Sequence, residues 1–223
     1  MKIAPVTKQH FGAIPLSEIK INNSDSNYKL YEITPNDEKF LDNLSDNLDL
    51  GKLMPKMSYE EIFVWKDLIN SAIRKSKNYS TKTILETYND VPCGILNYSD
   101  NKHFKVNYVA TFPDKKNHRV PYAGQILFNE LFKRFIDGMH TRIELEALRI
   151  GPFSPISTYL KLGFGMCGGN SLLEKMVASR EKVLTTLAKQ DQFIISNVIK
   201  NKEEVDLGKI THTDHFLAID SVV

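Results

Sequence analysis

The segment His118–Leu127 reads HRVPYAGQIL and leads from a polar loop into the clearest amphipathic pattern of the chain. A helix is predicted over Ala123–Ile136, because apolar residues recur at helical spacing: Ile126, Leu127, Leu131 and Phe135. The start of a helix exposes unpaired N–H groups and a partial positive charge, which suit a diphosphate. Ala123 and Gly124 leave room for a ligand near the backbone, and Arg119 adds a cation. This segment is a candidate phosphate site, although such helix starts also occur without a ligand.

Upstream of this segment, the sequence predicts two helices among strands. One helix begins at the Thr34–Asp37 cap and ends at Gly51, and the next begins at the Ser58–Glu61 capping box. The second helix has four apolar residues that we expect to be buried: Ile62, Phe63, Ile69 and Ile73. Alternating patterns predict strands over Tyr28–Ile33, Thr81–Tyr88, Gly94–Tyr98 and His103–Phe112, with a hairpin turn at Asn89-Asp90.

Downstream, a strand is predicted over Thr141–Leu148 and a short helix over Ile156–Leu162, which Gly163 would terminate. We expect a further amphipathic helix through residues 172–187 and strands over Phe193–Ile199 and Lys209–Ile219. The order from residue 28 is β-α-α-β-β-β-α-β-α, which indicates a mixed α/β fold with a central antiparallel meander. We expect three segments: an N-terminal arm and linker (1–27), a core (28–165) and a C-terminal extension (166–223) that completes or covers the core.

The composition excludes several classes of protein. Apolar residues are 42% of the 223 residues and charged residues 25%, which excludes a wholly disordered chain. The 29 basic and 27 acidic residues nearly balance, so we expect neither nucleic acid nor membrane as a partner. Cys93, Cys167, His212 and His215 lack the spacing of a metal site, and we expect no metal.

No window approaches the roughly 18 apolar residues of a membrane span, and Met1–Leu16 lacks the apolar core of a signal peptide. We therefore expect a cytoplasmic protein. Export by a route that reads no hydrophobic signal would leave no trace in the sequence.

A second motif, Tyr159-Leu160-Lys161-Leu162-Gly163-Phe164, follows the phosphate-site segment after one strand and one short helix. Together the two motifs resemble those of the GNAT family of acyl-coenzyme A dependent N-acyltransferases, over about residues 80–165. The family's phosphate loop, Gln/Arg-x-x-Gly-x-Gly/Ala, falls on Arg119, Tyr122 and Gly124. The resemblance implies a mixed, mainly antiparallel central sheet flanked by helices on both faces, and acetyl-coenzyme A as the acyl donor.

The sequence departs from the family pattern at several positions. Tyr122 replaces the first loop glycine, and Pro121 cannot donate an N–H, so we expect a phosphate cradle with fewer donors. The loop Asp114–His118 is longer than usual, and its Lys115 and Lys116 could reach a phosphate or be merely solvated. Gly151-Pro152-Phe153-Ser154 stands where many relatives carry asparagine.

The resemblance also implies roles for individual residues. The coenzyme arm would lie along Val109, Ala110 and Thr111, and Tyr159 would lie near the departing thiolate. The phosphates would be held by the loop and the first helical turn, that is, by Arg119, Val120, Tyr122, Ala123, Gly124 and Gln125. A neutral amine would attack the thioester directly. Trp65 is predicted to lie in the core or on the substrate side.

The general base is not fixed by the resemblance, because His103–Phe112 contains no acid. Glu144 and Glu146 lie two apart on the next strand and so share a face, and we prefer Glu146 because it is nearer the strand's end. Glu86 and a water relayed by backbone carbonyls remain alternatives.

Three functions are compatible with these features. The first is an N-acetyltransferase acting on a small-molecule or protein amine, as a monomer or homodimer. The second is a non-catalytic GNAT-like module that binds a protein partner. The third and weakest is a nucleic-acid-binding module that uses Lys115, Lys116, His118 and Arg119, since charge elsewhere is balanced.

Overall fold

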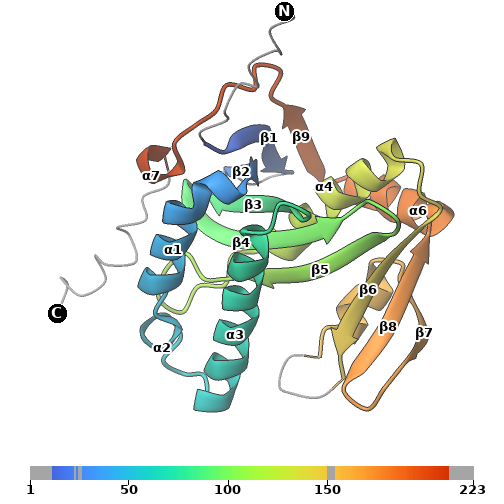
Figure 1. Ribbon diagram of the computed structural model, residues 1–223, viewed down its shortest axis with the longest axis horizontal. Helices are drawn as coiled ribbons and strands as arrows, with labels where there is room; N and C mark the ends of the chain where they lie inside the picture. The colour runs from blue at the N-terminus through green and yellow to red at the C-terminus, as the bar shows by residue number, and fades with distance from the viewer. Residues whose placement is uncertain (1–11, 23, 25–26, 150–153, 211–223) are drawn as a thin grey trace, which may run out of the picture.

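The computed structural model describes residues 12–22, 24, 27–149 and 154–210. These residues form one nine-stranded sheet with the strand order β7-β8-β6-β5-β4-β3-β2-β1-β9 (Figure 1). The strands are β1 (Ile14–Ile21), β2 (Tyr28–Ile33), β3 (Lys82–Tyr88), β4 (Val91–Ser99), β5 (Phe104–Thr111), β6 (Arg142–Leu148), β7 (Gly165–Gly169), β8 (Leu173–Ser179) and β9 (Ile194–Val198). The helices are the 3-10 turn η1 (Pro35–Asp37), α1 (Glu38–Asn47), α2 (Leu50–Leu53), α3 (Tyr59–Ser76), α4 (Ala123–Asp137), α5 (Ile156–Lys161), α6 (Arg180–Gln190) and α7 (Leu207–Ile210).

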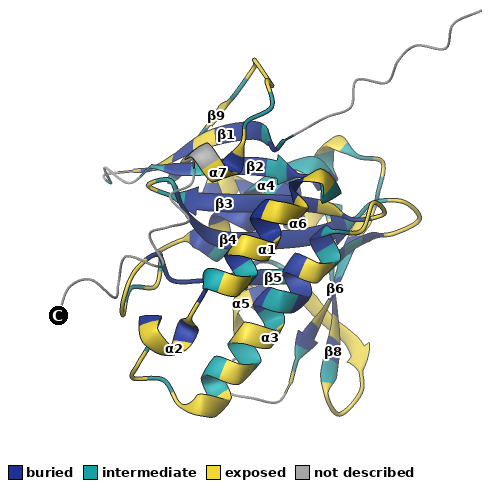
Figure 2. Cartoon of the chain, turned by 60° about the vertical axis from the view of Figure 1, so that its left-hand side comes forward, coloured by how far each residue is buried: buried dark blue, intermediate teal, exposed yellow. Residues whose placement is uncertain are grey.

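Helices cover both faces of the sheet, each over its own apolar cluster. On one face, α1, α2 and α3 pack on the sheet through residues such as Leu41, Leu50 and Ile69. On the other face, α4, α5 and α6 bury a second cluster that includes Phe132 and Phe164. Figure 2 shows the central strands as largely buried between the two helical layers. The mainly antiparallel sheet with helices on both faces confirms the predicted fold class.

The strongest local signals of the sequence are confirmed. In the Ser58 capping box, the Ser58 hydroxyl accepts from Glu61 N at 3.3 Å and the Glu61 carboxylate accepts from Ser58 N at 2.8 Å. Asn89 and Asp90 both have positive φ, 50° and 64°, as a two-residue hairpin turn between β3 and β4 requires. Gly163 has φ of 89° after α5.

The predicted N-terminal arm is wrong for Ile14–Ile21, which form β1 and pair with both β2 and β9. The pairing with β2 has an irregularity between Pro15 and Ser17, and the side chain of Ser17 is buried. The bulge shifts the alternation of inward and outward residues, so the segment lacks the period-2 pattern of a regular strand. Residues 1–11 lie outside the described part of the chain.

The helix predicted through residues 172–187 is also wrong, because β8 occupies its first half and α6 begins only after Ser179. The buried positions of β8 alternate at Glu174, Met176 and Ala178. One of these inward side chains is a carboxylate that pairs with Arg149, so the period-2 apolar pattern is hidden. The Ser179 hydroxyl accepts from Lys182 N and caps α6.

Three smaller expectations also fail. Phe63 is 62% exposed and is not part of the buried stripe of α3. Gly51 lies within α2 and does not end a helix. The strand predicted to begin at Lys209 is wrong at its start, where α7 extends to Ile210, and residues 211–219 lie outside the described range.

Strands β5 and β6 separate soon after they meet. They are the parallel pair of the sheet, and their register joins only Phe104 with Ile143 and Lys105 with Glu144. Beyond these two pairs β6, β8 and β7 turn away from β5, as Figure 1 shows. The remainder of β5, from Val106 to Thr111, therefore has β4 on one side and an opening on the other.

Candidate active site

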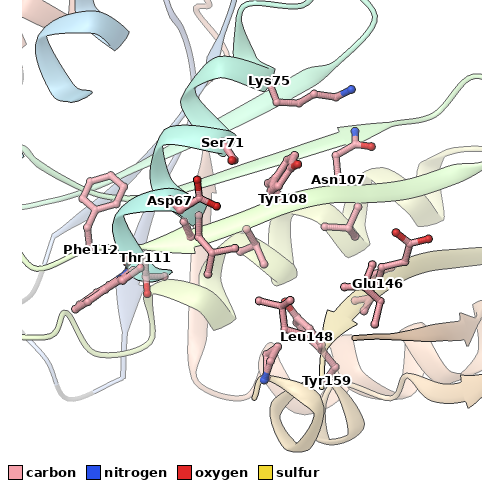
Figure 3. A pocket seen from close by; sticks show the side chains of 18 of the residues that line it. Asp67, Ser71, Lys75, Asn107, Tyr108, Thr111, Phe112, Glu146, Leu148 and Tyr159 are labelled. Carbon is pink, nitrogen blue, oxygen red and sulfur yellow. Dashed lines mark hydrogen bonds between the residues drawn. The ribbon is translucent and has the colours of Figure 1, made fainter. Parts of the chain in front are cut away.

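The opening between β5 and β6 is a cavity of about 670 Å³ that extends under α3 (Figure 3). Strand β5 lines it from Lys105 to Thr111, and Phe112 follows directly after the strand. Helix α3 forms one wall, and Leu145 to Leu148 of β6 together with α5 contribute the other side. The gap between β5 and β6 thus connects the face of the sheet covered by α4 and α5 with the face covered by α3.

The structure brings most of the predicted site residues to this cavity. The lining includes Val109, Ala110 and Thr111 of β5, Arg119 and Val120 of the following loop, Glu146 of β6 and Tyr159 of α5. Four predicted phosphate-site residues do not line it and instead form the start of α4: Tyr122, Ala123, Gly124 and Gln125. The two groups are adjacent, because a Cβ placed on Gly124 would lie 3.9 Å from Thr111 Cγ2.

The side chain of the N-cap residue, Tyr122, does not cap the first turn of α4. Gln125 N and Ile126 N donate to the Tyr122 carbonyl at 2.8 and 2.9 Å, so the Gln125 amide is used within the turn. A Cβ on Gly124 would meet Thr111 alone within 4 Å, which leaves the backbone of Gly124 open to a ligand. The amides available to an anion are therefore those of Ala123 and Gly124.

Tyr122 adopts a left-handed backbone conformation, with φ of 59°. This conformation favours glycine and costs a residue with a side chain roughly 1 kcal/mol. Its side chain is 47% exposed, and its ring centroid lies 5.9 Å from that of Phe193. Tyr122 thus keeps the backbone shape of a loop glycine while its side chain turns toward the segment before β9.

The first part of the loop before α4, residues 114–118, is folded onto α2 and does not line the cavity, whereas Arg119 and Val120 do. Asn117 N donates to the Leu53 carbonyl at 2.7 Å, and His118 Nδ1 contacts the buried Asp114 carboxylate. Lys115 and Lys116 are exposed and do not line the cavity. Whether these lysines reach a phosphate bound at the start of α4 stays a prediction.

Arg119 is held at the mouth of the cavity. Its guanidinium lies 5.3 Å from the ring centroid of Trp65, a cation–π distance. The Trp65 indole N–H in turn donates to the Thr111 carbonyl at 2.6 Å and ties α3 to the end of β5. Trp65 is a wall residue of the cavity, one of the two positions predicted for it.

Tyr159 reaches the cavity from the opposite helical layer. Its side chain is 9% exposed, and its ring packs edge-on against Phe128 and Phe164, with centroids 5.7 and 6.1 Å away. Burial raises the pKa of Tyr159 to about 12. The phenol is therefore protonated throughout the neutral range and can donate a proton or hydrogen bond into the cavity.

The three glutamates considered as general base lie in different environments. Glu146 lines the cavity and lies 3.4 Å from Lys105 Nζ. Glu144 pairs with Arg142 at 2.8 Å and is not part of the lining. Glu86 is fully buried under α4, and burial raises its pKa well above the usual value. The alternative of Glu86 as general base is wrong, because its carboxyl has no access to the cavity.

The sequence interpretation missed polar residues that line the cavity from α3 and β5. Asp67, Ser71 and Lys75 follow one another at intervals of four along α3, and Asn107 and Tyr108 face them from β5 (Figure 3). The four-residue spacing was the available signal, since it places all three on one face of the helix. A polar face of this kind is usually solvated, so the spacing alone does not identify a site.

Neither cysteine shows the features of a nucleophile. Cys93 is buried, and burial raises the pKa of its thiol, while Cys167 lies exposed on β7. Within the described ranges, no three His, Cys, Asp or Glu side chains gather as metal ligands would. His212, His215 and Gly151-Pro152-Phe153 lie outside the described residues. In the same ranges no helix is both long and apolar enough to cross a membrane.

No protein-family model and no curated protein matches the sequence. Solved structures do match the fold. The apo structure of FdhC, described as a nucleotide-linked sugar GNAT, aligns with a TM-score of 0.50 at 16% identity, over 79% of this chain and 97% of that one. An uncharacterized protein from Bacillus halodurans aligns with a TM-score of 0.51 at 11% identity, over 78% and 95% of the two chains. These likenesses concern the fold, which this chain shares with FdhC and with the Bacillus halodurans protein.

Proposed function

We propose that this chain, which has the GNAT fold, is an N-acyltransferase that transfers an acetyl group from acetyl-coenzyme A to an amine. One observation carries the proposal. The divergence of β5 and β6 opens a cavity that contains both a protonated phenol, Tyr159, and a carboxylate, Glu146. The same cavity borders the start of α4.

The residues present fit the coenzyme. The amides of Ala123 and Gly124 and the guanidinium of Arg119 would hold its diphosphate. The inner edge of β5, from Val109 to Thr111, would pair with the amide groups of its arm. The coenzyme would supply an acetyl group activated as a thioester.

The chemistry requires two proton transfers, one at each reacting atom. The amine nitrogen forms a bond to the acetyl carbonyl carbon, and the carbon–sulfur bond breaks. Glu146 would take the proton that the amine loses and then release it to solvent. Tyr159 would donate a proton to the departing thiolate, and the tyrosine would then regain a proton from solvent. The protein also contributes by holding the two reactants together in one cavity.

Coenzyme binding is expected to raise the melting temperature. Coenzyme A at 100 times its dissociation constant stabilises the native state by about 2.7 kcal/mol, which is roughly 5–10 °C for a domain of this size. Arg119→Glu should remove at least half of this shift, because it replaces a cation beside the diphosphate by an anion. Lys39→Glu, the same charge change on the exposed side of α1, should retain the shift. An unchanged melting temperature of the wild type at millimolar coenzyme would favour a non-catalytic module.

The position of Glu146 leads to a second prediction. Glu146→Gln should lower kcat by roughly 100-fold, because the amide cannot accept the amine proton. Glu144→Gln is the matched control, since this residue is two positions away on the same strand but pairs with Arg142 outside the cavity. Steady-state kinetics on both variants would check this. Equal losses in the two, or none in either, would assign the base to a water molecule.

A further inference from the structure

Resting on the acyltransferase function proposed above, we propose that the acceptor amine also carries an anionic group, a carboxylate or a phosphate, and that Lys75 binds that group. The structure has two separate cationic positions in one cavity. Arg119 lies at the end near Thr111, where it stacks on Trp65. Lys75 lies at the other end, near Asn107 (Figure 3).

The two ends are defined by how α3 crosses β5. Trp65 is bonded to Thr111, so the N-terminal half of α3 lies at the end of β5 that borders α4. Lys75 is ten residues further along the helix, which corresponds to about 15 Å. Figure 3 shows its side chain extending toward Asn107, near the point where β5 and β6 still pair. Lys75 is therefore remote from the amides that would bind the coenzyme diphosphate.

The charges of the lining leave Lys75 available to a ligand. Two acids, Asp67 and Glu146, and three cations, Lys75, Lys105 and Arg119, line the cavity. Glu146 is already paired with Lys105, and Arg119 stacks on Trp65. Across the described residues, no carboxylate lies within ion-pair distance of the half-buried Lys75.

The surplus of cations in the cavity lining favours some acceptor amines over others. A polycationic amine would enter a cavity whose lining has a surplus of cations, which is unfavourable. An amine with an attached anion would place that anion on Lys75 and its amino group near Glu146, the carboxylate proposed to accept its proton. A charge-assisted hydrogen bond from Lys75 inside a partly water-excluded cavity is stronger than one at the surface.

The test compares pairs of acceptors that differ only in the anion. Lysine is compared with 1,5-diaminopentane, which lacks its carboxylate, and glucosamine 6-phosphate with glucosamine. Coenzyme A release is measured by chromatography for the wild type, Lys75→Met, Lys75→Glu and the control Lys66→Glu, a charge reversal at an exposed α3 residue outside the cavity. The shift of melting temperature with coenzyme A is recorded for each variant, so that unfolded protein is recognised.

We expect the wild type to favour the anionic member of at least one pair by tenfold or more in kcat/KM. The pair that responds identifies the anion as carboxylate or phosphate. Lys75→Met should abolish the preference, Lys75→Glu should reverse it, and Lys66→Glu should keep it. A preference for the diamine, or one that survives Lys75→Glu, would overturn the inference.

Two further outcomes distinguish a failure of the proposed role of Lys75 from a failure of the acyltransferase function on which it rests. A protein that binds coenzyme A but acetylates none of the anionic amines contradicts the role of Lys75 and leaves the coenzyme site standing. A protein that does not bind coenzyme A at all contradicts the proposed function, and the inference fails with it.

Discussion

Tyr159→Phe is expected to lower kcat by about 100- to 10,000-fold, while the KM for acetyl-coenzyme A changes little. The phenol lies in the cavity with its pKa raised to about 12, so the wild type holds a proton there at every pH of ordinary assay. Phenylalanine keeps the ring and its packing on Phe128 and Phe164 but removes that proton. The departing thiolate would then leave without a nearby acid.

The control for this variant is Tyr79→Phe, which removes a hydroxyl from an exposed turn before β3. It should leave the kinetics unchanged. Because Tyr159 stays protonated below about pH 11, the activity of the wild type should not decline between pH 7 and pH 10 through loss of this proton. Wild-type turnover in Tyr159→Phe would remove the phenol from the mechanism.

Glu86→Gln is expected to make the protein less sensitive to alkaline pH. Glu86 is fully buried beside Gly94 and Leu127, and neither carboxyl oxygen has a hydrogen-bond partner within the described residues. Burial raises its pKa well above 4.5, so the folded protein holds a proton that the unfolded chain releases. The free energy of unfolding of the wild type therefore falls by about 1.4 kcal/mol for each pH unit between the two pKa values.

The change in the free energy of unfolding with pH that Glu86 causes is opposite in sign to the change that an ion-paired acid causes. Below pH 4.5 the carboxyl is neutral in both states and has no effect, and the loss of stability grows as the pH rises toward the folded-state pKa. Glutamine does not titrate, so the stability of Glu86→Gln relative to the wild type should increase from pH 5 to pH 8. Urea unfolding at several pH values measures this, with exposed Glu203→Gln as the control. A constant difference across this pH range would show that Glu86 is not protonated in the native state.

Local sequence signals predicted the parts of the fold that depend on short-range interactions. The Ser58 capping box and the Asn89-Asp90 turn are determined by hydrogen bonds and backbone angles within a few residues. The motifs at Arg119 and Tyr159 are each local too, and the strand order brings them to one cavity. For the capping box and the turn the sequence was sufficient, whereas the meeting of the two motifs in one cavity depends on the strand order.

The features that could not be predicted depend on contacts between distant segments. Glu174 is buried in β8 because Arg149, 25 residues away, pairs with it. Glu146 and Glu86 are both glutamates within predicted strands, and their different environments follow from the position of each strand in the sheet. Lys75 cannot be distinguished from a solvated lysine until β5 and α3 are seen to enclose a cavity.

The separation of β5 from β6 has a consequence for association with other proteins. Exposed strand edges invite pairing with foreign chains, and proteins commonly cover or shorten them to avoid aggregation. Here an unpaired edge of β5 is placed inside the molecule, between α3 and α5, instead of at the rim of the sheet. The unpaired backbone groups of β5 thus face a cavity inside the molecule and not the outer rim of the sheet.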